Sequence, residues 1–190
     1  DTASTANVKA YSPTGSQVWA SSAGGTFKSK EGLAMNADGS HVYCPGDTSP
    51  RELVTLDGSS GSEVWNFSVG NPVKSGVALS EGAEDLVYFG DDGVTMRARV
   101  DNGLTSAAKY SVAGSNPVKA VAATQRDGAE VVIFNTEASN TLLCYKYSGA
   151  GTAGTLLWTA SLGGVAKNAI AISPDASFVV ATADNQVVYA

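Results

Sequence analysis

Four of the eight lysines occupy one position of a repeated pattern. Each stands four residues before an alanine that recurs along the chain, and two of them end the near-identical segments Asn71-Pro72-Val73-Lys74 and Asn116-Pro117-Val118-Lys119. Ammonium groups gathered at one edge of a fold repel one another unless they meet an anion, a carboxylate or water. The pattern predicts a ring of cations that binds a carboxylated or phosphorylated ligand, or an acidic segment of a partner. The residues of this predicted binding site are Lys30, Lys74, Lys119 and Lys167.

The same four lysines also have a purely structural interpretation. Each ammonium group then pairs with a nearby Asp or Glu, while the apolar stem of the side chain extends along the surface towards water. The shared position would in that case reflect the repeat alone. Both interpretations are open at the level of the sequence.

Catalytic chemistry has few candidate residues in this chain. The single histidine, His41, is the only available base for a nucleophilic triad, and its place at the edge of a hairpin predicts a solvent-facing side chain. Glu84 and Asp85 point to opposite faces of a strand and so form no acid/base pair. Asp91-Asp92-Gly93 is typical of a hairpin turn. We therefore expect no catalytic residue, no metal site and no cofactor, and a protein that is not an enzyme.

The two cysteines, Cys44 and Cys144, fall in different repeats. Non-adjacent repeat units should hold them beyond the reach of a disulfide, and we expect both to be small buried apolar residues. Two cysteines and one histidine also exclude the common zinc sites.

Composition limits the partners and the compartment. The 190 residues carry a net charge of −6, which excludes a strongly basic surface for nucleic acid and a polybasic membrane anchor. The apolar runs are too short to span a bilayer. The length suits a single domain over residues 1–190. Few lysines and the glycosylation signal Asn66-Phe67-Ser68 favour a secreted, cell-surface or organelle-lumen protein.

An internal repeat of 45 to 48 residues organises the chain. Its large aromatic residues recur at that spacing, and a segment with two short apolar stretches around an Asp, Gly, Ser or Pro turn recurs in the same phase. We place the repeats at about 7–50, 51–93, 94–140 and 141–185, with a partial repeat at 186–190. The recurring aromatics are Trp19, Trp65, Tyr110 and Trp158.

Each period predicts four strands and no helix. In the second period the strands are expected at Glu52–Asp57, Glu63–Val69, Ser75–Ser80 and Asp85–Gly90. A four-stranded unit of this length is the size of one β-propeller blade, so the sequence predicts an all-β propeller of four blades plus a partial one. Because one blade cannot bury both of its faces, neighbouring blades must stack. The recurring aromatic would then fill the space between them.

The segment from Ala10 to Trp19, AYSPTGSQVW, resembles the AxDxxTGxxxW signature of PQQ-like (quinoprotein-type) propeller repeats. The second repeat is similar from Asp57 to Trp65, and the fourth keeps Gly154 and Trp158, whereas the third departs from the signature. The resemblance implies a propeller fold, and rings of this family usually have seven or eight blades. A quinoprotein enzyme would also need an acidic calcium site, an arginine at the quinone and often adjacent cysteines, which the motifs found here do not supply.

The two ends of the chain fall at the same position of the repeat. Asn7–Tyr11 opens the chain at a third strand, and Gln186–Ala190 again reaches a third strand. Either Val18–Ser22 completes the last blade and closes a four-bladed ring, or the chain is an arc of a larger ring.

These features favour a non-enzymatic binding or scaffolding module. Its expected partners are another protein or the remaining blades of a larger ring, with an anionic ligand at the mouth of the channel as a further possibility. One alternative is a quinoprotein-type enzyme or sensor whose catalytic residues lie outside this chain. The other is a carbohydrate-binding surface protein with Tyr11, Trp19 or Tyr147 stacking on sugars.

Overall fold

The structure, a computed structural model, consists of strands and turns. It describes residues 8–22, 32–46, 52–80, 84–114, 116–137, 140–148, 153–164, 166–184 and 188–189, with the backbone alone at 166–169 and 188–189. No helix occurs in these residues, and hence none that could cross a membrane. The strands are β1 (Val8–Tyr11), β2 (Gln17–Ser21), β3 (Ala34–Met35), β4 (His41–Pro45), β5 (Glu52–Asp57), β6 (Glu63–Ser68), β7 (Ala78–Ser80), β8 (Leu86–Gly90), β9 (Thr95–Asp101), β10 (Ser106–Ala113), β11 (Val118–Arg126), β12 (Ala129–Thr136), β13 (Thr141–Tyr147), β14 (Thr155–Ser161), β15 (Ala166–Ile172), β16 (Val179–Ala183) and β17 (Val188–Tyr189).

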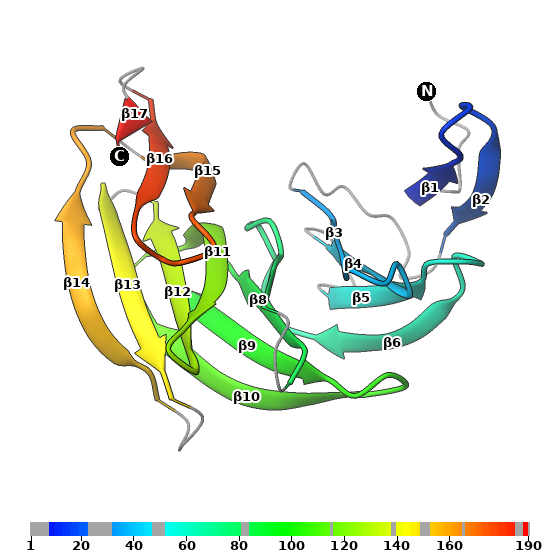
Figure 1. Ribbon diagram of the computed structural model, residues 1–190, viewed down its shortest axis with the longest axis horizontal. Coiled ribbons are helices and arrows are strands. Elements are labelled where there is room, and N and C mark those ends of the chain that lie inside the picture. The colour runs from blue at the N-terminus through cyan, green and yellow to red at the C-terminus, as the bar shows by residue number, and fades with distance from the viewer. Residues whose placement is uncertain are drawn as a thin grey trace.

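The strands form antiparallel sheets that stand side by side like the blades of a propeller. Three sheets have four strands each, in the orders β3-β4-β5-β6, β7-β8-β9-β10 and β11-β12-β13-β14. Figure 1 shows β3, β8, β11 and β15 towards the inside of the arc and β6, β10 and β14 along its outer edge. The predicted all-β propeller fold is confirmed.

The ring is open. At one end β1 and β2 form a two-stranded sheet of their own, and at the other end β15, β16 and β17 form a three-stranded sheet. These two small sheets lie on either side of the opening in Figure 1. β2 therefore pairs with β1 and does not complete the last sheet, so the four-bladed closure considered from the sequence is not the arrangement that the structure shows.

The strands of a sequence period are shared between two sheets. In the second period, β5 and β6 are the third and fourth strands of one sheet, whereas β7 and β8 are the first and second strands of the next. The four predicted strands lie at the expected places, although the third covers only Ala78–Ser80. Each period thus connects a blade to its neighbour.

The core is divided among the boundaries between sheets. One cluster joins Tyr43, Leu53 and Trp65 of the β3–β6 sheet to Val87 and Phe89 of the β7–β10 sheet. Further clusters of the same kind lie between the other neighbouring sheets. Since burial of one such side chain contributes about 1.5–3 kcal/mol, the sheets are stabilised mainly by their neighbours.

Candidate functional site

In three of the sheets the recurring aromatic contacts the next sheet, near the turn between the third and fourth strands of that next sheet. Trp19, on β2, lies against the β5–β6 turn and donates its indole N–H to the carbonyl oxygen of Gly58 at 2.9 Å. Gly61 of the same turn has φ +72°, and a Cβ there would lie 2.5 Å from the indole ring of Trp19. Glycine is therefore required by both the turn and the docked ring.

Trp65, on β6, also contacts the next sheet, but its hydrogen-bond acceptor there is a carboxylate. Its indole N–H donates to Asp101 at 3.1 Å, and the hydroxyl of Tyr43 donates to the other carboxylate oxygen at 2.6 Å. Nδ1 of His41 lies 2.6 Å from that oxygen. The expectation that His41 faces solvent is therefore wrong: its side chain is only 15% exposed, because the acid at the end of β9 in the next sheet holds it.

Tyr110, on β10, takes this place in the third boundary. Its ring stacks on Tyr147 with the ring centroids 4.0 Å apart, and it is buried. The predicted placement of the large aromatic between blades is thus correct for Trp19, Trp65 and Tyr110. Because Trp19 and Tyr147 are buried, only Tyr11, which is exposed, could stack on a sugar among the three aromatics considered for carbohydrate binding.

Trp158, on β14, is the exception. It is 39% exposed, whereas Trp19, Trp65 and Tyr110 are between 4% and 9% exposed. The residues just before it on β14, Leu156 and Leu157, are also exposed. A large apolar surface is uncommon outside interaction sites, so this part of the molecule is the best candidate for a binding site.

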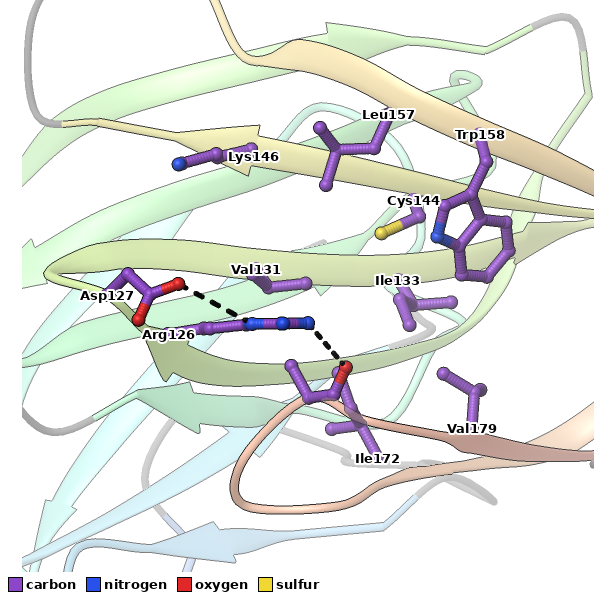
Figure 2. Close-up of a pocket in the computed structure, with 11 residues that line it drawn as sticks. Arg126, Asp127, Val131, Ile133, Cys144, Lys146, Leu157, Trp158, Ile172 and Val179 are labelled. Carbon is purple, nitrogen blue, oxygen red and sulfur yellow. Dashed lines mark hydrogen bonds and ion pairs between the residues drawn. The ribbon is translucent and has the colours of Figure 1, made fainter.

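Two adjoining cavities, which we call the Trp158 groove, lie between β14 and the β15–β16 turn. Their volumes are about 280 and 420 Å³, and both are lined by Trp158, Ala176 and Val179. Figure 2 shows Arg126, Asp127 and Lys146 at one end of the smaller cavity and Trp158 and Val179 at the other. The groove therefore offers apolar contacts along its length and charge at one end.

Cys144 forms part of the floor of the Trp158 groove. It is 1% exposed, and burial raises the pKa of its thiol to about 11. The thiol is therefore protonated near neutral pH and is a poor nucleophile. As predicted, Cys44 and Cys144 are buried and free. The groove is suited to binding by shape and apolar contact.

The lysines of the predicted ring are paired where their side chains are described. Lys74 forms an ion pair with Asp92, and Lys119 forms one with Glu137 at 3.1 Å. The two pairs are equivalent, since Val73 and Val118, the residues before the lysines, pair with the residues before the acids. Lys30 lies outside the described residues, and the side chain of Lys167 on β15 is not described. Anion binding by these lysines stays a prediction.

A signal for this pairing was present in the sequence and was missed. Acids recur in phase with the lysines, just after the second strand of each sheet, at Asp47, Asp92, Glu137 and Asp184. A search for a repeated acid beside each repeated lysine would have favoured local pairing. By contrast, nothing local in the sequence pairs His41 with Asp101, which is 60 residues away.

The residues present do not fit a quinone and its calcium ion. Asp91 and Asp92 lie at the β8–β9 turn, as predicted, but Asp91 accepts hydrogen bonds from Arg97 and from the backbone N–H of Thr95. Asp92 is the partner of Lys74. The two cysteines belong to different clusters of the core. Among the described residues, no group of three or more His, Cys, Asp or Glu side chains is placed to hold a metal.

Comparison with solved structures shows the same fold. The chain has 16% identity and a TM-score of 0.60 with BamB from Moraxella catarrhalis, covering 87% of this chain and 46% of that one. It has 19% identity and a TM-score of 0.66 with a chain of the mitotic checkpoint complex, covering 82% of this chain and 48% of that one. With a chain from the structure of BBS1N in complex with ARL6DN it has 10% identity and a TM-score of 0.66, covering 94% of this chain and 55% of that one. The chain thus spans about half the length of these proteins.

No curated protein matches the chain. A family model does, under the description outer membrane protein assembly factor BamB, over residues 4–140. That match covers most of the chain and includes the first two signature segments, from Ala10 to Trp19 and from Asp57 to Trp65. The chain therefore belongs to the PQQ-like propeller repeat family of the outer membrane protein assembly factor BamB.

Proposed function

We propose that this chain is a non-enzymatic scaffold that holds a segment of another polypeptide in the Trp158 groove. The observation that carries the proposal is the exposure of Trp158, whose three counterparts are buried against a neighbouring sheet. The aromatic at this position packs against the neighbouring sheet at Trp19, Trp65 and Tyr110, and among the described aromatics of the repeat only Trp158 keeps that face available.

The chemistry of the groove favours a polypeptide as its occupant. Tryptophan is enriched among the residues that dominate protein–protein binding energy, and Leu157 with Val179 extends the apolar contact on either side of it. Arg126 and Lys146 at one end supply a charged rim of the kind that surrounds interface cores. Cys144, the cysteine that lines this groove, is a buried, protonated thiol and so a poor nucleophile.

The comparisons support the same proposal. The family is described as an assembly factor, and two of the similar propellers were solved in complexes with other chains. The outer membrane named in the family description favours an extracytoplasmic compartment for this chain, in keeping with the compartment expected from its composition. A partner protein outside the cytoplasm is therefore the expected ligand.

Site-specific photo-crosslinking in the cells that produce the chain would test the proposal. A photoreactive phenylalanine analogue in place of Leu157 should give a defined crosslinked band. The same analogue in place of Leu104, an exposed residue of the β9–β10 turn, should give none. Adding Trp158→Ala should remove the band at 157. Equal crosslinking at 157 and 104, or a band at 157 that survives Trp158→Ala, would count against the groove as a binding site.

A further inference from the structure

We infer that a cavity between β6 and the β9–β10 hairpin binds a carboxylate group, and that Arg99 holds this group. The cavity, which we call the Arg99 cavity, has a volume of about 420 Å³. Its lining includes Phe67 of β6, Arg97 and Arg99 of β9, and Lys109 of β10. Figure 1 shows β6 beside β10, at the boundary between two complete four-stranded sheets. The site is separate from the Trp158 groove, and the inference does not rest on the proposed function.

The two arginines stand where the other four-stranded sheets carry apolar residues. In each of these sheets, the recurring aromatic of the fourth strand pairs with one residue of the third strand. The residues on either side of that partner are Val54 and Leu56 in β5, Arg97 and Arg99 in β9, and Leu143 and Tyr145 in β13. The apolar members belong to core clusters or pack against them. Packing between sheets therefore does not call for arginines at these positions.

Arg99 carries a charge that no acid balances. Arg97 pairs with the buried Asp91 at 2.9 Å, and Lys109 pairs with Glu84. No Asp or Glu in the described part of the chain pairs with Arg99, although this residue is only 9% exposed. Burial and the like charge of Arg97 lower the pKa of Arg99 from its usual value. An anion in the cavity would remove the cost of this uncompensated charge.

The guanidinium group of Arg99 is held in a fixed orientation. Its Nε–H donates to the hydroxyl of Ser106 at 2.9 Å, and Nη2 donates to the carbonyl oxygen of Ser106 at 3.0 Å. Its carbon atom Cζ lies 3.7 Å from the centre of the Phe67 ring. An arginine has five N–H donors, so the contacts with Ser106 leave three for another acceptor. A planar carboxylate matches such a fork of donors.

The charges favour a carboxylate over a phosphate group. Only one cation of the cavity lacks an acid partner, so one negative charge restores the balance. A phosphate monoester would bring nearly two. The ring of Phe67 and the side chain of Ala108 offer apolar contact to the rest of the ligand. The expected ligand is therefore a monocarboxylate with an apolar body, either a small molecule or an acidic side chain of a polypeptide.

Fluorine NMR with para-fluorobenzoate tests the inference on the purified chain. The parent chain should broaden the signal of this probe and leave that of para-fluorobenzamide, its uncharged counterpart, sharp. Arg99→Leu gives β9 the residue that β5 has at the same position, Leu56, and should fold and bind the probe roughly 10-fold more weakly or worse. The matched control is Arg126→Leu, which removes an exposed arginine at the Trp158 groove and should bind like the parent chain.

A second variant covers the case in which Arg99→Leu fails to fold. Arg99→Lys keeps the positive charge but lacks the fork of donors, so it should bind para-fluorobenzoate more weakly than the parent chain. Circular dichroism and the melting temperature show whether each variant is folded. Three results would overturn the inference: no broadening by the parent chain, equal broadening of the two probes, or full binding by a folded Arg99 variant.

Competition with two dipeptides distinguishes the sources of the carboxylate. If acetyl-Phe-Glu-amide displaces para-fluorobenzoate and acetyl-Phe-Gln-amide does not, the ligand is an acidic side chain. If neither displaces it, the ligand is a small carboxylate, and the inference stands in both cases. Equal displacement by both dipeptides would show that charge does not matter and would contradict it. Arg99→Leu should leave crosslinking at residue 157 unchanged, so this site and the proposed function succeed or fail separately.

Discussion

Asp101 accepts the indole N–H of Trp65 across the boundary between two sheets, at 3.1 Å. The carboxylate also accepts a hydrogen bond from the hydroxyl of Tyr43 and pairs with His41. One acid of the β7–β10 sheet therefore contacts three side chains of the β3–β6 sheet. It is almost fully buried, with 3% of its side chain exposed. The boundary between these sheets therefore depends on a polar contact inside an otherwise apolar core.

Replacing Asp101 should loosen this boundary. Asp101→Ala removes the acceptor and leaves the buried donors of Tyr43 and Trp65 without it, which costs about 2–4 kcal/mol of unfolding free energy. Asp101→Asn keeps an acceptor oxygen and should lose less. Urea denaturation measures both values, and a loss below about 0.5 kcal/mol for Asp101→Ala would contradict the assigned role.

The contact between Trp19 and Gly61 predicts a paired effect of two alanine substitutions. Gly61→Ala must adopt φ +72° and also meets the indole of Trp19, whereas Gly39→Ala must adopt φ +74° in open space. The strained φ alone costs about 1 kcal/mol. Overpacking should add about 1–3 kcal/mol at Gly61 only. Thermal unfolding of the two variants checks the difference, and equal losses would show that the ring yields without penalty.

Two aspartates in turns, Asp57 and Asp175, should contribute to the loss of folded-state stability at low pH. Hydrogen bonds from Ser59 and Ser60 lower the pKa of Asp57 to about 2, and those from Ser173 and Ser177 lower the pKa of Asp175 to about 2. Because each folded-state pKa lies below the unfolded value, their stabilisation is complete above about pH 4 and is lost as the pH falls towards 2. Both acids are exposed, so solvent screening keeps the effect small.

The measurement for these acids is the melting temperature between pH 7 and pH 2. The variant with Asp57→Asn and Asp175→Asn should melt lower than the parent chain at pH 7. Its melting temperature should then fall less steeply between pH 4 and pH 2. Parallel curves for the two proteins would show that other carboxyl groups account for the acid sensitivity.

The lysine pairs predict a small stability effect and provide a direct test of anion binding. Lys119 and Glu137 are both partly exposed, so Lys119→Met should lower the unfolding free energy by less than about 1 kcal/mol. Pyrophosphate is a suitable probe for the predicted ring. If the pairs satisfy the lysines, it leaves the melting temperature unchanged. A rise that disappears in the double variant Lys74→Met, Lys119→Met would establish the anion site predicted from the sequence.

The two cysteines form an internal comparison for the Trp158 groove. Cys144 lines the groove together with Trp158, whereas Cys44 lies in the cluster around Val8 and Trp19. Burial raises the pKa of both thiols, to about 11 and about 12 respectively, and both should react slowly with iodoacetamide. Trp158→Ala should speed alkylation of Cys144 several-fold and leave Cys44 unchanged, as mass spectrometry of the labelled peptides would show.

The repeat made most of the fold predictable. Periodic aromatics and alternating apolar stretches identify the strands, and the size of the unit identifies the blade, because a single sheet cannot bury both of its faces. A turn glycine also stands four residues before each signature tryptophan, but its contact with the tryptophan of the preceding sheet, as between Gly61 and Trp19, is visible only in the structure.

The remainder depends on contacts between periods. His41 and Asp101 lie in different sheets and at different positions of the repeat. The repeat pattern therefore cannot show that they pair. The exposure of Trp158 depends on which turn covers it, and three other members of its series, at the same repeat position, are buried. In both cases the sequence gives the residue type, whereas the neighbouring sheet determines what the side chain contacts.

The division of each sequence period between two sheets has a consequence for how such a chain can change length. Loss of one whole period would remove the outer half of one blade and the inner half of the next. The remaining halves would then join as a complete blade, with a boundary of the same kind on each side. Tandem duplication of a period would lengthen the arc in the same way. Insertion or deletion of one repeat therefore changes the number of blades in the arc without requiring a new kind of boundary between sheets.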